Sequence, residues 1–125
     1  MSVPRKRILI ADDDPAIAKM LSRLLGRDHD VVVAEDGATA VALATKEPTP
    51  DLALLDIMMP VMDGLTVAQQ IKNHPNLKKI PIIFITARST PMDVIRGIQV
   101  GARSYITKPF TLDDVRDKVS KALKI

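Results

Sequence analysis

The sequence contains no cysteine and no tryptophan, and its aromatic residues are two phenylalanines and one tyrosine. The absence of cysteine excludes disulfides, thiolate zinc sites and cysteine nucleophiles, and it fits a reducing compartment. So few aromatic side chains cannot form the stacking platforms that bind single-stranded nucleic acid. We therefore expect no direct nucleic-acid binding by this chain.

Long apolar runs are also absent. A membrane-spanning helix needs about 20 apolar residues, and a signal peptide needs an apolar region of about 7–15 residues. Runs such as Ile82–Ile85 are far shorter, and only Ile8–Ala11 separates the basic residues near the N-terminus from Asp12. We expect no membrane span, no export signal and a cytoplasmic location.

Neither sign of charge dominates the composition. The 125 residues include 18 basic and 15 acidic side chains, which gives a net charge of +3, and 46% of the residues are hydrophobic. This balance is typical of a folded globular protein, and the mild basic excess is weak support for an anionic partner. The length predicts one domain over residues 1–125, with a core over about 6–124.

Five short apolar segments are predicted to be strands. Their polar and apolar residues do not alternate, which is typical of parallel strands covered on both faces. The segments are Ile8–Ala11, Val31–Ala34, Leu52–Leu55, Ile82–Ile85 and Tyr105–Thr107.

Five helices are predicted between and after these strands, and four of them have a capping residue at the start. The capping residues are Asp14, Asp63, Thr90 and Thr111, and the second helix is predicted over Asp36–Thr45. The predicted buried stripes are Ile17, Met20, Leu21, Leu24 and Leu25 in the first helix and Leu112, Val115, Val119, Ala122 and Leu123 in the last. Strict alternation of strands and helices predicts right-handed crossovers and a three-layer α/β sandwich around a parallel sheet.

Polar side chains follow the predicted strands at their carboxyl ends, where such sheets bind ligands. The first strand is followed by Asp12, Asp13 and Asp14, and Asp14 is explained as a helix cap. The others are followed by Asp56, Thr86 and Lys108, and Asp56 directly ends a segment suited to complete burial. Carboxylates about 5 Å apart repel by roughly 3 kcal/mol per pair at an effective dielectric near 20, so the aspartates need a cation in addition to Lys108.

A hard divalent cation fits this group of side chains. The donors are all oxygens, which selects Mg²⁺, or alternatively Mn²⁺, over zinc. His29 and His74 are interpreted as solvated surface residues at turns or helix ends. Asp56 is the candidate nucleophile, because a carboxylate can accept a phosphoryl group when Mg²⁺, Lys108 and the Thr86 hydroxyl neutralise the charge on the transferring oxygens.

Four segments resemble the response-regulator receiver domain of two-component signalling, and the resemblance covers essentially the whole chain. The segments are Ile8–Asp14 (ILIADDD), Leu54–Gly64 (LLDIMMPVMDG), Phe84–Ala87 (FITA) and Tyr105–Phe110 (YITKPF). The resemblance implies a flavodoxin-like sheet in the order 2-1-3-4-5. It also implies a phosphorylation-driven switch without turnover of an external substrate.

The resemblance further implies a role for each site residue. Asp56 accepts the phosphoryl group from a phosphohistidine, Asp13 and the Met58 backbone carbonyl bind Mg²⁺, and Asp12 orients the waters of the metal. Lys108 pairs with the phosphoryl group, and its bond to Pro109 is cis.

Thr86 and Tyr105 are the implied switch residues. The resemblance implies that, after phosphorylation, they reshape the surface of the fourth helix, fifth strand and fifth helix, and that this surface meets an output partner or domain. The implied partners also include a histidine kinase or a phosphotransfer protein, and the chain is a monomer or a phosphorylation-dependent dimer.

Simpler interpretations apply to several of these residues. Asp63 and Gly64 suit the start of a helix rather than chemistry, and Thr86 or Tyr105 alone would be an ordinary strand residue. Met58 and Arg88 stand at positions where the family varies, and they leave the lifetime of the aspartyl phosphate open.

Two other functions compete with the switch. In a haloacid-dehalogenase-like phosphatase Asp12 would be the nucleophile and Asp56 would have no role. A phosphorylation-independent binding module would instead use its basic helices on an acidic partner.

Overall fold

The computed structural model describes residues 5–87 and 90–125. Within them, strands and helices alternate as predicted: β1 (Arg7–Ala11), α1 (Pro15–Leu25), β2 (Asp30–Ala34), α2 (Gly37–Thr45), β3 (Leu52–Leu55), α3 (Gly64–Asn73), a short 3₁₀ helix η1 (Pro75–Leu77), β4 (Ile82–Thr86), α4 (Pro91–Gln99), β5 (Ser104–Thr107) and α5 (Leu112–Leu123). All neighbouring strands are parallel, and their order is β2-β1-β3-β4-β5. The predicted sheet order is confirmed.

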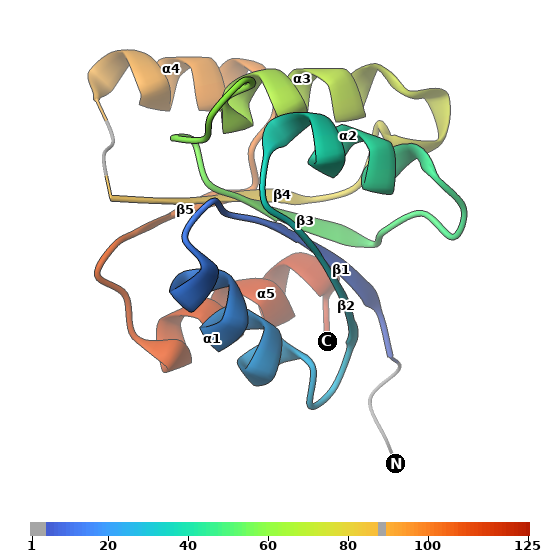
Figure 1. Ribbon diagram of the computed structural model, residues 1–125, viewed down its shortest axis with the longest axis vertical. Helices are drawn as coiled ribbons and strands as arrows, with labels where there is room; N and C mark the ends of the chain where they lie inside the picture. Colours follow the sequence, from blue (N-terminus) through green and yellow to red (C-terminus); the bar gives the residue numbers. More distant parts are fainter. Residues whose placement is uncertain (1–4, 88–89) are drawn as a thin grey trace.

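Helices cover both faces of the sheet. Figure 1 shows α2, α3 and α4 on one face and α1 and α5 on the other. Neighbouring residues of the central strands point to opposite faces, so Leu9 and Phe84 pack in the core under α2 and α3, whereas Ile10 and Ile83 pack in the core under α1 and α5. The predicted three-layer α/β sandwich is therefore confirmed.

Burial on both faces holds for the central strands and not for the edges. The apolar residues of β1, β3 and β4 are buried, whereas β2 is only partly covered and its Val33 is 39% exposed. An edge strand has a neighbour on one side only, and its side chains lie at the border of the helical layers. The unbroken apolar pattern overstated the burial of β2.

The predicted helix starts are confirmed by their capping hydrogen bonds. Asp14 Oδ1 accepts from the Ala16 amide at 2.9 Å, and Asp63 Oδ1 accepts from the Thr66 amide at 2.8 Å. Thr90 caps α4 in a reciprocal capping box with Asp93. These caps satisfy amide groups that have no partner within the helix, and they fix where each helix begins relative to the preceding strand.

Three predictions about individual side chains are wrong. His29 is buried, with 6% of its surface exposed, and its Nδ1 accepts a hydrogen bond at 3.2 Å from the amide of Lys6, the residue before β1. Met20 and Leu112, predicted to be in buried stripes, are 38% and 43% exposed. Both line a groove between α1 and α5 rather than facing the sheet.

Candidate functional site

The predicted strand-end residues meet at one edge of the sheet. Asp12 and Asp13 follow β1, Asp56 follows β3, Thr86 ends β4 and Lys108 follows β5. One carboxylate oxygen each from Asp12, Asp13 and Asp56 lies within 4.8 Å of the other two. The adjacency of β1 and β3 in the sheet brings these carboxylates together, although more than forty residues separate them along the chain.

Lys108 bridges two of the carboxylates. Its Nζ donates to Asp12 Oδ2 at 2.9 Å and to Asp56 Oδ2 at 3.0 Å. The side chain of Asp12 is fully buried and that of Asp56 is 6% exposed, whereas Asp13 is exposed. The site therefore combines two buried carboxylates, paired with Lys108, and one solvent-exposed carboxylate, that of Asp13.

Backbone hydrogen bonds fix the orientation of both buried carboxylates. Asp12 Oδ1 accepts from the Asp14 amide at 2.9 Å, and Asp56 Oδ1 accepts from the Met58 amide at 3.0 Å. The Lys108 amide donates to the Thr86 carbonyl at 2.9 Å, which ties the lysine to the end of β4. The peptide bond between Lys108 and Pro109 is cis, as expected.

The electrostatics of the site follow from burial and from this network. Burial raises the pKa of Asp12, and the nearby Asp56 charge acts in the same direction, while hydrogen bonds from Asp14 and Lys108 oppose the shift. For Lys108, burial favours the neutral form, but the hydrogen bonds to Asp12 and Asp56 outweigh it and raise the pKa of the ammonium. Lys108 thus stays charged in its half-buried position.

One lysine does not balance three carboxylates. With Lys108 charged and Asp12, Asp13 and Asp56 ionised, two negative charges are left within a few ångströms. A divalent cation would compensate both of them, and oxygen-only donors suit a hard ion. The residues present fit the predicted metal.

A cleft of about 540 Å³ opens beside the acidic residues. Asp13, Met58 and Asp63 contribute to its walls, and the Met58 side chain is 53% exposed there. Of the three clustered carboxylates, Asp13 is the one that lines this cleft. Arg88, the other residue expected to affect phosphate lifetime, lies outside the described residues.

Thr86 and Tyr105, the expected switch residues, lie in the last two strands of the sheet. Thr86 is fully buried at the end of β4. The Tyr105 ring packs against Phe84, with ring centroids 5.3 Å apart, and its hydroxyl donates to the Asp93 carbonyl of α4 at 2.7 Å. Tyr105 therefore connects β5 to α4 in this structure.

Gly64 contributes to the site in a way that the sequence interpretation missed. A Cβ atom at this position would lie 2.1 Å from the Asp56 carbonyl oxygen. The Gly64 amide also donates to the Ile57 carbonyl at 2.9 Å, so the start of α3 lies directly against the backbone of the candidate nucleophile. Helix-start preference explains Asp63, which caps α3, but it gives no signal for this close approach.

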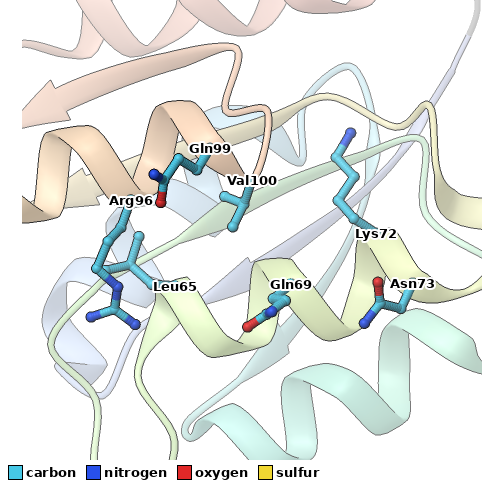
Figure 2. Close-up of a pocket in the computed structure, with 7 residues that line it drawn as sticks. All are labelled: Leu65, Gln69, Lys72, Asn73, Arg96, Gln99 and Val100. Carbon is cyan, nitrogen blue, oxygen red and sulfur yellow. The ribbon is translucent and has the colours of Figure 1, made fainter.

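A second hollow, of about 420 Å³, lies between α3 and α4 (Figure 2). Its cations, Lys72 and Arg96, lie in the last turns of their helices, where positive charge stabilises the helix dipole. Lys72 Nζ donates to the carbonyls of Lys78 and Ile80, and its side chain extends away from Gln69 in Figure 2. We assign these groups a structural role.

Comparison with known proteins shows the family of this chain. The family model of the response regulator receiver domain matches residues 8–120. The chain belongs to this family. It is a receiver domain of the kind found in two-component response regulators. Receiver domains are signalling switches rather than enzymes that turn over a substrate.

Relatives and solved structures extend this similarity. Response regulator PleD of Caulobacter vibrioides is 43% identical over 110 residues, covering 87% of this chain and 24% of PleD. Vibrio cholerae chemotaxis protein CheY4 has a TM-score of 0.88 at 28% identity, covering 95% of this chain and 99% of that one.

The receiver domain of sensor histidine kinase PA1611 from Pseudomonas aeruginosa has a TM-score of 0.87 at 26% identity, covering 98% and 100% of the two chains. Its structure has a magnesium ion coordinated in the active site cleft.

The chain spans about a quarter to about half the length of the curated relatives it matches. No helix in the described part of the receiver domain is long and apolar enough to cross a membrane. The family match favours the receiver interpretation over the haloacid-dehalogenase-like one, and Asp56, which would have no role in that phosphatase, is bonded to the same lysine as Asp12.

Proposed function

We propose that this receiver domain accepts a phosphoryl group on Asp56 from the phosphohistidine of a histidine kinase or phosphotransfer protein. The observation that carries the proposal is the buried Asp56 carboxylate, held by Lys108 beside Asp12 and Asp13. In the transfer, the bond between phosphorus and the histidine nitrogen breaks, a bond from an Asp56 oxygen to phosphorus forms, and the nitrogen keeps the electron pair.

The proposed metal is Mg²⁺, with Mn²⁺ as the alternative. Asp12, Asp13, Asp56 and the Met58 backbone carbonyl would hold it, with Asp12 orienting its waters. Support comes from the clustered carboxylates and from the magnesium-bound relative. When bound, the ion neutralises charge on the phosphoryl oxygens. Lys108 supplies a further positive charge at the same oxygens, and Thr86 supplies a hydroxyl.

The proposed output is a change in the surface formed by α4, β5 and α5. The phosphoryl group draws Thr86 and Lys108 toward it, and Tyr105 carries the change to α4. Support comes from the bond between Tyr105 and α4 and from large apolar side chains exposed on that helix, including Ile95 at 49% and Ile98 at 69%. Exposed apolar side chains that form a contiguous patch are typical of surfaces that bind a partner.

The wider setting is part of the same proposal. The chain acts in the cytoplasm as one receiver domain over residues 1–125, with its core over about 6–124. It meets a downstream protein or output domain through the α4, β5 and α5 surface. It is a monomer or a phosphorylation-dependent dimer, and it does not bind nucleic acid itself.

Phosphorylation with a small donor tests the proposal directly. Incubation with acetyl phosphate and Mg²⁺ should add one phosphoryl group, which intact-mass spectrometry detects. No phosphoryl group should be added when Mg²⁺ is chelated before the donor is introduced. Asp56→Asn should abolish it. Asp117→Asn, which removes an exposed carboxylate of α5, is the matched control and should react as the unsubstituted protein does.

Two outcomes would contradict the assignment of Asp56 as the acceptor. A phosphoryl group that is still added to Asp56→Asn, or one that maps to another residue, would show that Asp56 is not the acceptor.

A further inference from the structure

The contact between α4 and the rest of the fold is narrow. Among the α4 residues, all of which the structure describes, only Gly97 is buried. Beneath it lies the Tyr105 side chain from β5: a Cβ atom at position 97 would be 2.0 Å from the Tyr105 hydroxyl oxygen and 2.7 Å from Cζ. Real Cβ atoms essentially never lie at such distances, so the Tyr105 ring cannot keep this position when residue 97 has a side chain.

The Tyr105 ring is held in this position from two other sides. Its face packs against Phe84 of β4, and its hydroxyl donates to the Asp93 carbonyl. Asp93 also forms the capping box with Thr90 that starts α4. The end of the ring therefore occupies the space beside Gly97 and is tied to the first turn of the same helix.

Backbone conformation gives no reason for glycine at position 97. The residue lies inside a regular helix, and its φ is not positive. Glycine in a helix interior is less favourable than alanine, because it loses more conformational freedom on folding. The neighbour that a Cβ atom at this position would meet is the Tyr105 ring.

We propose that Gly97 is a positioning residue for Tyr105, leaving the notch in which the ring lies beneath α4, and that any side chain at position 97 expels the ring and uncouples α4 from β5. The ring position is a property of the fold alone. The consequence for signalling rests on the proposed function, in which Tyr105 carries the response to α4.

Nuclear magnetic resonance of the ring tests the first part. The chain has one tyrosine, so the ring signals have a single assignment. Gly97→Ala should move the Tyr105 ring signals toward those of a solvent-exposed tyrosine. Because burial and the nearby Asp93 charge raise the pKa of the Tyr105 hydroxyl, the variant should also ionise at lower pH. Gln99→Ala, an exposed change in the same helix, is the control and should leave both unchanged.

A double-mutant cycle separates this steric role from a general effect on helix stability. Where Tyr105 is present, Gly97→Ala should lower the melting temperature. In a Tyr105→Ala background the notch is empty, and the same substitution should raise the melting temperature through helix propensity. An increase of equal size in both backgrounds, or unchanged ring signals in Gly97→Ala, would overturn the proposal.

The link to signalling is tested with beryllofluoride and Mg²⁺ as a phosphoryl mimic. Gly97→Ala should keep the amide shift changes next to Asp56 and lose most of those in α4. Full α4 changes in the variant would refute uncoupling. If the unsubstituted protein shows no response near Asp56, the proposed function fails, and the ring signals and melting temperatures still decide the role of Gly97.

Discussion

Removal of the Lys108 charge should destabilise the protein through the two carboxylates that it leaves buried. In Lys108→Met, which keeps most of the apolar stem, Asp12 and Asp56 lose hydrogen bonds of 2.9 and 3.0 Å to the ammonium. Carboxylate oxygens within 4.8 Å then repel by about 3.5 kcal/mol at an effective dielectric near 20. Removal of one partner from a buried ion pair costs about 3–5 kcal/mol, and we expect a loss of this size.

Thermal unfolding without divalent cations is the assay. For a chain of this length 1 kcal/mol corresponds to about 4 °C, so the melting temperature of Lys108→Met should fall by about 12–20 °C at neutral pH. The loss should depend on pH. Burial raises the pKa of Asp12, so the ionised carboxylate destabilises the fold above that pKa. The difference in melting temperature between Lys108→Met and the unsubstituted protein should therefore decrease as acid protonates Asp12. The raised pKa of Lys108 means that its contribution in the unsubstituted protein persists at neutral pH and is lost only in strong alkali.

Two further measurements separate charge from packing. Asp12→Asn added to Lys108→Met removes one of the two buried charges and should recover more than half of the lost melting temperature. Saturating Mg²⁺ should raise the melting temperature of Lys108→Met more than that of the unsubstituted protein, because the variant has one more uncompensated negative charge. A Lys108→Met protein as stable as the parent, or a loss that acid and Asp12→Asn both leave unchanged, would refute the electrostatic explanation.

Two other substitutions test the metal and the backbone around Asp56. Asp13→Asn should weaken Mg²⁺ binding by about tenfold or more in a calorimetric titration, because one unit charge next to the ion is lost. Asp14→Ser, which keeps a helix cap, is the control and should bind Mg²⁺ as the unsubstituted protein does. Equal Mg²⁺ affinities for the unsubstituted protein and both variants would contradict the proposed ligands. Gly64→Ala should cost about 1–3 kcal/mol, because its Cβ would lie 2.1 Å from the Asp56 carbonyl oxygen. The amide resonances around Asp56 should shift in Gly64→Ala. Unshifted resonances together with unchanged stability would show that position 64 does not lie against the Asp56 backbone.

The sequence was sufficient for the strands and the helix starts, because these features are local. Apolar segments predict strands through their own composition, and Asp14, Asp63 and Thr90 cap helices through amides two or three residues away. Local rules failed where another segment decided the outcome. His29 is buried where the Lys6 amide, just before β1, donates a hydrogen bond to its ring, and Met20 and Leu112 are exposed because α1 and α5 leave a groove between them.

The sequence by itself determined that Asp12, Asp13, Asp56, Thr86 and Lys108 lie at one edge of the sheet, because parallel strands end on the same side. Only the tertiary structure decided how they interact. Lys108 and Asp12 are 96 positions apart, yet their side-chain atoms are 2.9 Å apart, because β5 and β1 belong to the same sheet. The same holds for Gly64 beside Asp56 and Gly97 beside Tyr105. A glycine has no side chain, so its role is visible only once the fold shows which atom occupies the space beside it.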